Sequence, residues 1–352
     1  METRRLLVLP GDGIGPEVIG AALAVLEAVS HRRGFAYTID EGLLGGAAID
    51  ATGDPYPPET RRKVEQHQAV LLGAVGGPKW DDRPRRPEAG LLELRQHMGV
   101  YANLRPFEVW PGLEHLSPLR TQGFRGLIVR ELTGGIYFGT PRGRREVDGE
   151  WEGFDTMRYR QSEIRRLARV GFEWARRQNT PLVSIDKANV LETSRVWRET
   201  VTALGREEYP DVPLVHRYVD AAAMEMVLHP ERYAVAITEN LFGDILSDLA
   251  GGLVGSLGLL ASLSVSGEVG SRGLYEPVHG SAPDIAGKGI ANPVGAILSL
   301  AWLMGWTWAD AESQALVTQA VAETIRAGEL TPDLGGSLST EAFTRRVIER
   351  LG

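Results

Sequence analysis

Runs of consecutive apolar residues recur along the chain and predict buried strands. The first run, Leu6–Leu9, ends directly before a Pro-Gly-Asp-Gly turn. Continuous apolar runs of this length are typical of strands in a parallel sheet that is covered on both faces. Further strands are predicted at Ala69–Leu72, Gly126–Glu131, Leu182–Ile185 and Val235–Thr238.

The segments between these runs carry apolar residues at helical spacing. After Pro16, a residue that suits the first turn of a helix, the repeat continues as far as Leu26. Strands that alternate with helices predict an α/β fold with a largely parallel sheet. Helices are also predicted at Glu163–Gln178, Asp220–Leu228 and Leu241–Leu249, and exposed loops or an arm at Trp80–Pro87 and Pro141–Trp151.

The composition narrows the classes of protein to consider. A length of 352 residues predicts about two domains, and 43% hydrophobic with 24% charged residues is ordinary for a globular protein. The net charge of -8 argues against nucleic acid or a membrane surface as partner. There is no cysteine, no signal-peptide pattern, and no apolar stretch long enough to span a bilayer, so we expect a cytoplasmic protein.

The glycine-rich start, Gly11-Asp-Gly-Ile-Gly-Pro16, resembles a dinucleotide-binding fingerprint only in part. The fingerprint needs a glycine where Pro16 stands, and no acidic residue ends a clear second strand at the right distance. We therefore predict a tight strand-to-helix turn. A contact to some ligand at this sheet edge stays open, and the turn alone identifies no cofactor.

Asp244 and Asp248 lie four residues apart in a predicted helix, so their carboxylates share one face. Two such charges repel unless a cation compensates them, and Mg²⁺ or Mn²⁺ prefers oxygen ligands. Asp220, at the start of another predicted helix, is a candidate third ligand. A solvated helix face with a capping aspartate is the alternative interpretation.

Arginines beside apolar segments suggest an anionic ligand. Arg95, Arg105 and Arg130 each lie in or next to such a segment, and guanidinium groups bind carboxylates in a bidentate manner. Tyr137 follows two glycines, and Lys187 ends a predicted strand, where ligands bind in α/β sheets. A lysine near other cations has a lowered pKa and can act as a base. Surface ion pairs and structural hydrogen bonds are the alternatives for these residues.

Taken together, these segments resemble the β-decarboxylating dehydrogenases, the family of isocitrate and isopropylmalate dehydrogenases. The resemblance runs from about Leu6 to the C-terminus, and the last two stretches are the most specific. The matching stretches are LPGDGIGPEV, LLGAVGGPKWD, GLLELRQHMGVYANLRP, RELTGGIYFG, SIDKANVLETSRVWRE, NLFGDILSDLAGGLVGSLGLL and EPVHGSAPDIAGKGIANP.

The resemblance implies two α/β domains of the family type rather than a standard Rossmann fold. The first, cofactor-side domain is expected at residues 1–100 and 258–352, and the second, inserted at residues 101–257, is expected to carry the metal, catalytic and dimer-contact residues. It also implies a homodimer with shared active sites. The implied reaction is oxidative decarboxylation of (2R,3S)-3-isopropylmalate to 4-methyl-2-oxopentanoate and CO₂, with reduction of NAD, in leucine biosynthesis.

The resemblance also implies roles for individual residues. The metal ligands are Asp220, Asp244 and Asp248, and the catalytic pair is Tyr137 and Lys187. The substrate is expected to meet Glu88, Leu91, Leu92, Arg95, Arg105, Arg130 and Asp220. The cofactor is expected to meet Ile14, Gly76, Gly77, Glu276, His279, Gly280, Ser281, Ala282, Pro283, Asp284, Ile285 and Asn292.

Three rival functions remain to be weighed. A sister enzyme acting on homoisocitrate, isocitrate or tartrate would leave a polar substrate group against Leu91 and Leu92. A catalytically silent regulatory subunit is expected to lack metal or catalytic residues, and this chain has Tyr137, Lys187 and the three aspartates. A plain nucleotide-binding module does not account for those aspartates together with the arginines.

Overall fold

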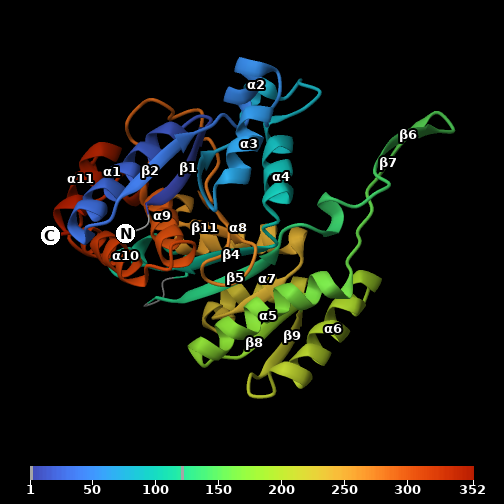
Figure 1. Cartoon of the computed structure of the whole chain (residues 1–352). Coiled ribbons are helices and arrows are strands. Elements are labelled where there is room, and N and C mark those ends of the chain that lie inside the picture. Colours follow the sequence, from blue (N-terminus) through green and yellow to red (C-terminus); the bar gives the residue numbers. More distant parts are fainter. Residues whose placement is uncertain (1–2, 120–122) are drawn as a thin grey trace. The chain divides into compact units, whose positions relative to one another are not determined.

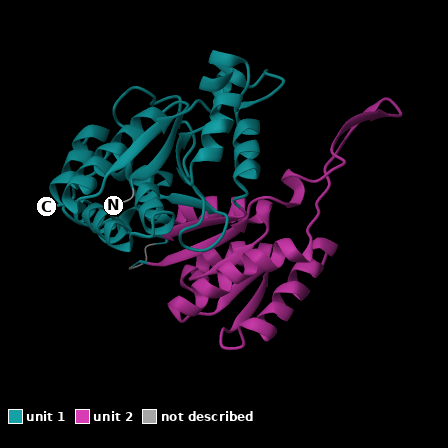
Figure 2. Ribbon diagram, in the orientation of Figure 1, with its two compact units in different colours: residues 1–100, 108–123, 254–352 teal, residues 101–107, 124–253 magenta. Residues whose placement is uncertain are grey.

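The computed structural model describes residues 3–119 and 123–352, and the chain divides into two compact units (Figure 2). The chain starts in unit 1 and crosses into unit 2 and back twice. Unit 1 comprises Met1–Val100, Glu108–Gly123 and Val254–Gly352, and unit 2 comprises Tyr101–Phe107 and Phe124–Leu253. Residues 108–123 thus lie in unit 1, whereas the sequence-based expectation assigns them to the inserted domain.

Unit 1 is built on strands in the order β2-β1-β3-β12-β11 (Figure 1). β1 pairs in parallel with β2 and β3, β12 pairs in parallel with β3, and β11 runs antiparallel to β12. The apolar runs form the central strands, and every residue of β3 is buried. The strands are β1 Arg4–Gly11, β2 Tyr37–Glu41, β3 Ala69–Ala74, β11 Ala261–Val265 and β12 Gly273–Pro277.

The helices of unit 1 cover this sheet. α9 is apolar on all sides and almost entirely buried, as expected for a helix at the centre of the core. α1 begins at Gly15 with Pro16 in its first turn and ends at Arg33, followed by Gly34, which has a left-handed backbone. The helices are α1 Gly15–Arg33, α2 Gly46–Thr52, α3 Pro58–Gln66, α4 Pro87–Met98, α9 Val294–Trp306, α10 Ala311–Arg326 and α11 Thr340–Glu349.

Unit 2 has strands in the order β4-β5-β10-β8-β9. β10 pairs in parallel with β5 and β8, and β8 pairs in parallel with β9, so carboxyl ends of several strands meet at one edge. The strands are β4 Ala102–Glu108, β5 Arg125–Glu131, β8 Leu182–Asp186, β9 Leu214–Tyr218 and β10 Ala236–Thr238. The helices are α5 Gln161–Gln178, α6 Glu192–Glu208, α7 Val219–Leu228 and α8 Asn240–Val254.

A two-stranded hairpin projects from the rest of unit 2 (Figure 1). It consists of β6 Gly143–Val147 and β7 Glu150–Phe154, paired antiparallel, and nearly all of its side chains are exposed. This segment is the breaker-rich stretch for which the sequence predicts an exposed loop or an arm. Trp151, an apolar side chain, is 71% exposed on it.

The predicted α/β class is confirmed, and the predicted strands and helices are present with small shifts of their ends. One prediction was wrong: β2 is a clear second strand, and it ends at the acidic Glu41. Its sequence Tyr-Thr-Ile-Asp-Glu alternates in polarity at the sheet edge, so it lacks the apolar run used to recognise the other strands. Among the residues described, none of the helices combines the length and the apolar character that a bilayer span requires.

Asp310 joins the first strand of unit 1 to α10. Its carboxylate caps α10 by accepting hydrogen bonds from the backbone N–H and hydroxyl of Ser313, and it also accepts one from Nη2 of Arg4 at 2.8 Å. Burial by itself raises the pKa of Asp310, but these hydrogen bonds outweigh it, so the pKa lies below its ordinary value.

Replacing Asp310 by Ala is expected to lower the free energy of unfolding by about 1 to 2 kcal/mol at neutral pH, because it removes the cap and the ion pair. A folded-state pKa below the unfolded value means that this stabilisation is present above pH 3.8 and is lost as the pH falls through the folded value. Urea unfolding at pH 7 and near pH 3 measures both effects. Asp310→Asn, which keeps a cap acceptor without the charge, is the control. A loss that is the same at both pH values would contradict this role.

Candidate functional site

One face of α4 gathers four of the predicted site residues. Glu88, Leu91, Leu92 and Arg95 are spaced at i, i+3, i+4 and i+7, which places them along the same side of the helix. Arg95 is buried, and its Nη2 donates to Oε1 of Glu276 on β12 at 2.7 Å. Its buried Nε has no hydrogen-bond partner among the described residues. A buried unpaired guanidinium N–H is a donor available to a ligand.

The glycine-rich turn packs against the loop that follows β12. The backbone N–H of Ile14 donates to the carbonyl of Ser281 at 2.8 Å. A Cβ on Gly13, whose φ is +58°, would lie 1.9 Å from that carbonyl oxygen, so only glycine permits this approach. The predicted tight turn is therefore present, and it brings Ile14 beside Ser281, two residues expected to meet a cofactor.

Asp12 is a buried carboxylate of this region that the sequence interpretation did not single out. It accepts hydrogen bonds from the backbone N–H groups of Gly46, Ala47 and Gly76 at 2.8, 2.7 and 2.8 Å. Burial raises the pKa of Asp12 even though these hydrogen bonds lower it. Asp12 thereby fixes the start of the Gly76–Gly77 loop to the glycine-rich turn. The sequence signal that could have identified Asp12 is the presence of an acidic residue inside a glycine-rich turn.

The rest of the predicted cofactor segment is a loop without regular structure, from Gly280 to Pro293. Asp284 is exposed on it, and Ala282 has a φ of +39°, an unusual value for a residue other than glycine. Asn292 is buried and its amide is already paired, because Nδ2 donates to Asp333 at 2.9 Å and Oδ1 accepts from the N–H of Val294. Burial lowers the pKa of His279, just before the loop.

In unit 2, four other predicted residues gather around Asp244 on α8. Nη1 of Arg130 donates to Oδ1 of this carboxylate, and the phenol of Tyr137 donates to Oδ2 at 2.9 Å. Nη1 of Arg105 lies 3.4 Å from Asp244 and 3.3 Å from Asp248. The structure thus brings together the substrate arginines of this unit, two expected metal ligands and the expected catalytic tyrosine.

The environment of this cluster shifts the pKa values of two of its side chains, Tyr137 and Asp248. Burial, and then the negative charge of Asp244, raise the pKa of Tyr137, so its phenol keeps its proton at neutral pH. Burial raises the pKa of Asp248, with the charge of Asp244 acting in the same direction and Arg105 opposing it. Two neighbouring carboxylates of this kind are a favourable site for a divalent cation.

Lys187 and Asp220 form a separate pair. Lys187 follows β8, Asp220 lies in the first turn of α7, and Nζ of Lys187 donates to Oδ1 of Asp220 at 2.5 Å. The hydrogen bond from Lys187 holds the pKa of Asp220 below its ordinary value. Within the described part of a single chain, no group of three acidic, histidine or cysteine side chains is placed to hold a metal ion. Asp220 is therefore not assembled with Asp244 and Asp248 in one chain.

Buried neighbours of this cluster were missed by the sequence interpretation. Asn240 lies one helical turn before Asp244 and contacts Arg130, and Asn103 lies two residues before Arg105 and contacts it. Glu239 accepts hydrogen bonds from the N–H groups of Leu241 and Phe242, which caps α8. The spacing of Asn240 from Asp244 was a usable signal, because i and i+4 residues share a helix face.

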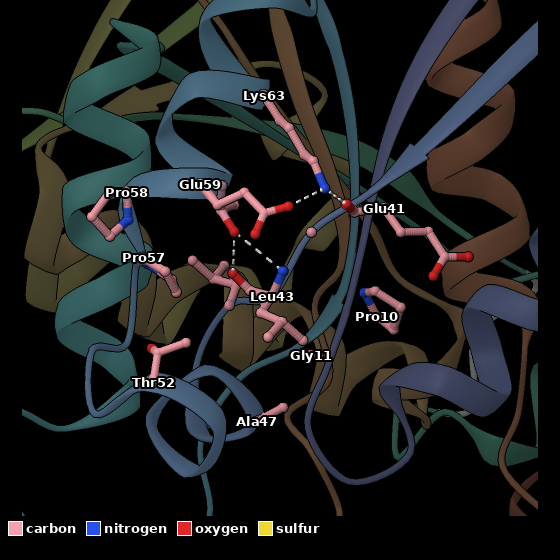
Figure 3. A pocket seen from close by; sticks show the side chains of 13 residues that line it. Pro10, Gly11, Glu41, Leu43, Ala47, Thr52, Pro57, Pro58, Glu59 and Lys63 are labelled. Carbon is pink, nitrogen blue, oxygen red and sulfur yellow. Dashed lines mark hydrogen bonds and ion pairs between the residues drawn. The ribbon is translucent and has the colours of Figure 1, made fainter.

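A cavity of about 450 Å³ lies elsewhere in unit 1, at the carboxyl ends of β1 and β2 (Figure 3). Its polar groups bind one another: Nζ of Lys63 donates to the backbone carbonyl of Glu41 at 2.7 Å and lies 2.9 Å from Glu59. None of the predicted site residues lines this cavity. It is the position where a standard Rossmann fold binds a nucleotide, but most of the predicted cofactor residues lie on the loop after β12, and the others are Ile14, Gly76, Gly77 and Glu276.

The fold and the site define a class: a two-unit α/β protein whose inserted unit concentrates arginine, aspartate and tyrosine around one helix. Residues 5–351 match the isocitrate/isopropylmalate dehydrogenase family, and the chain belongs to that family. The resemblance inferred from the sequence motifs is thereby confirmed, and the chain is assigned to the oxidoreductases.

Relatives and solved structures agree with this assignment. The chain is 52% identical to 3-isopropylmalate dehydrogenase of Anaeromyxobacter dehalogenans, over 99% of both chains. It is 48% identical to the enzyme of the same name from Aquifex aeolicus, over 100% of this chain and 98% of that one. The structure of isocitrate dehydrogenase from Methylococcus capsulatus is similar with a TM-score of 0.89 and 34% identity, covering 99% of both chains.

Two glycines of α8 offer a test of how tightly Arg130 is held. A Cβ on Gly243 would lie 2.6 Å from Cγ of Arg130, whereas a Cβ on Gly252 would meet nothing within 4 Å. We expect Gly243→Ala to lower the free energy of unfolding by about 1 to 3 kcal/mol, because the arginine side chain must move. Gly252→Ala, the matched control, is expected to raise it by about 0.5 to 1 kcal/mol. Urea unfolding of both variants measures these effects, and equal stabilisation by both would show that Arg130 is not packed against the helix.

Proposed function

We propose that this protein oxidises and decarboxylates 3-isopropylmalate with NAD as the hydride acceptor, in leucine biosynthesis. The observation that carries the proposal is the cluster around Asp244, where two arginines, two aspartates and a tyrosine meet. Anion-binding, metal-binding and proton-donating groups in one place suit a hydroxy diacid. Relatives about half identical over their whole length, which are named 3-isopropylmalate dehydrogenase, support this choice of substrate.

The proposed metal site consists of Asp244 and Asp248, with Asp220 supplied by a second chain. The two carboxylates of α8 lie one turn apart with partly exposed oxygens, and such hard oxygen donors fit Mg²⁺ or Mn²⁺. When bound, the cation supplies positive charge that stabilises negative charge developing on the substrate oxygens. Arg105 and Arg130 already balance part of the carboxylate charge.

The proton transfers are assigned to Lys187 and Tyr137. Lys187, directly or through a water that it orients, takes the proton of the substrate C2 hydroxyl. NAD, when bound, would supply the acceptor for the C2 hydride. Loss of CO₂ from the resulting β-keto acid leaves an electron pair on carbon, and Tyr137 donates a proton there. The raised pKa of Tyr137 suits this role, because its phenol is still protonated when the donor is needed.

The substrate's variable group is proposed to meet Leu91 and Leu92. Both leucines lie on the same face of α4 as Glu88 and Arg95, so an apolar surface sits next to a carboxylate-binding group. An isopropyl group gains from this surface, whereas the extra carboxylate of isocitrate or homoisocitrate would be left unpaired. This contrast favours 3-isopropylmalate over the substrates of the sister enzymes.

NAD is proposed to bind to unit 1, at the loop Gly280–Ile285 with Ile14, Gly76 and Gly77. Asp284 is exposed on this loop, and a carboxylate there can accept hydrogen bonds from ribose hydroxyls. The 2′-phosphate of NADP would meet like charge at the same place. In this assignment unit 1 is the cofactor domain, and unit 2 carries the metal and catalytic residues.

We propose that the protein acts as a cytoplasmic homodimer with shared sites. Large apolar side chains of unit 2 are exposed beside the site residues, as is typical of an interface. Met224 on α7, near Asp220, is 59% exposed, and Ile245 on α8, next to Asp244, is 57% exposed. Because Lys187 and Asp220 stand apart from the cluster around Asp244 within one chain, a second chain is proposed to supply this pair.

A panel of hydroxy diacids tests the proposal. With Mg²⁺ and NAD, formation of NADH followed by absorbance is expected to be fastest with 3-isopropylmalate. Malate, which lacks the alkyl group, is expected to have a lower kcat/KM, as are isocitrate, homoisocitrate and tartrate. A small apolar contact contributes about 1 to 3 kcal/mol, which corresponds to roughly 10- to 200-fold.

The same assay contains its controls. Replacing NAD by NADP is expected to lower kcat/KM, and chelation of the metal is expected to abolish turnover until Mg²⁺ is restored. Equal rates with malate and 3-isopropylmalate would refute the assigned substrate. Full activity after exhaustive chelation would refute the metal site while leaving the cofactor assignment intact.

A further inference from the structure

We propose that Asn103 and Asn240 are positioning residues that hold the guanidinium groups of Arg105 and Arg130 through neutral carbonyl oxygens, and so keep the positive charge available for the substrate carboxylates. This inference rests on the proposed function. It assigns a role to two buried asparagines beyond the predicted substrate, metal and catalytic residues.

The hydrogen bonds of Arg130 show one side of the arrangement. Its Nε and Nη2 both donate to Oδ1 of Asn240, at 3.0 and 2.7 Å, and its Nη1 donates to Oδ1 of Asp244. Asn240 is completely buried, and its Nδ2 donates to the carbonyl of Gly134, in the turn that leads to Tyr137. One amide therefore fixes the arginine and the turn carrying the tyrosine.

Arg105 is held in a similar way. It projects from the same face of β4 as Asn103, two residues earlier, and its Nε donates to Oδ1 of Asn103 at 2.9 Å. Its Nη1 donates to the hydroxyl of Ser247 at 2.6 Å, another neutral acceptor, and also to Oδ1 of Asp248 at 3.3 Å, and it lies 3.4 Å from Asp244.

Three arginines outside the site are held by carboxylates instead, although others, such as Arg61 and Arg195, donate through Nε to backbone carbonyls. Arg198 donates through Nε and Nη2 to the carboxylate of Asp186, at 2.8 and 2.9 Å. Arg169 and Arg176 use the same two nitrogens on Glu208 and Asp211. A carboxylate that accepts hydrogen bonds from Nε and Nη2 neutralises the guanidinium. An amide oxygen in the same place orients the guanidinium and leaves its net charge unchanged. Neutral acceptors on Nε occur at Arg105 and Arg130, two of the three arginines expected to bind an anion, whereas Nη2 of the third, Arg95, donates to Glu276.

This difference predicts which substitutions of the two asparagines weaken binding of the diacid most. Aspartate has nearly the shape of asparagine and can accept the same N–H bonds, but it adds a negative charge beside the arginine. At position 240 it also lacks the Nδ2 donor that Asn240 offers to the carbonyl of Gly134, so the change at Asn103 is the cleaner test of charge. Serine is neutral but too short to fill the position. If the asparagines serve binding by staying neutral, Asp variants must bind the diacid more weakly than Ser variants. If they serve only packing, the cavity left by Ser must be the more harmful change.

The experiment compares N103D, N103S, N240D and N240S with the wild-type protein. Calorimetric titration with 3-isopropylmalate and Mg²⁺, without NAD, measures binding, and NADH formation gives KM and kcat. We expect the Asp variants to raise both the dissociation constant and the KM of the diacid about tenfold or more, and above the values of the Ser variants. The KM for NAD is expected to stay unchanged. N179D, which adds the same charge at the exposed end of α5, is the control and is expected to bind like wild type.

The outcomes are separable. Ser variants that bind more weakly than Asp variants, or Asp variants that bind like wild type, would overturn the neutral-acceptor role while leaving the proposed function standing. Binding in the expected order without any turnover would support the role and refute the proposed reaction. A wild-type protein that does not bind the diacid would refute both. Loss of folding in both Asp variants would also overturn the role, because isosteric acceptors paired with arginine are expected to preserve the fold.

Discussion

The buried guanidinium of Arg130 needs a charged partner and hydrogen bonds, and the residues that provide them determine how the inserted unit is arranged. Its side chain is 2% exposed, and a charge removed from water must be paired and hydrogen-bonded to be tolerated. Asn240 and Asp244, one turn apart on α8, meet that need together. The position of α8 relative to β5 is therefore tied to one side chain, and Gly243 makes the close approach possible.

Several parts of the proposed site depend on this arrangement. Asp244, held by Arg130, in turn accepts the hydrogen bond of Tyr137, and Asn240 binds the turn in which that tyrosine lies. Glu239 caps the same helix and accepts a hydrogen bond from Tyr159. Positioning of the proposed proton donor, the anion-binding arginines and the proposed metal ligands is thus coupled within one buried network, so a change at one member is expected to disturb the others.

The sequence predicted the α/β class and the central strands, because long apolar runs report burial on both faces. It did not reveal β2, whose alternating residues at the sheet edge have no such run. Motif resemblance predicted that Arg105, Arg130, Tyr137, Asp244 and Asp248 share a function, and the structure places them in contact. Asn103 was missed, because a neutral residue that holds another side chain has no recognisable pattern until the chain is folded. Asp12 and Asn240 were also missed, although the glycine-rich turn around Asp12 and the spacing of Asn240 from Asp244 were signals in the sequence. Within one chain, Lys187 and Asp220 contact each other but form a pair separate from the cluster around Asp244.

The central claim is that the carboxylates facing Arg105 and Arg130 hold a divalent cation. Titration with Mn²⁺ in the presence of the diacid, followed by electron paramagnetic resonance, measures this directly. We expect one Mn²⁺ per chain in the wild-type protein, with affinity weakened at least about tenfold by Asp244→Asn or Asp248→Asn and retained in the control Glu163→Gln in the first turn of α5. Wild-type protein that binds no Mn²⁺, or an Asp244→Asn variant that binds it as tightly as wild type, would contradict the claim.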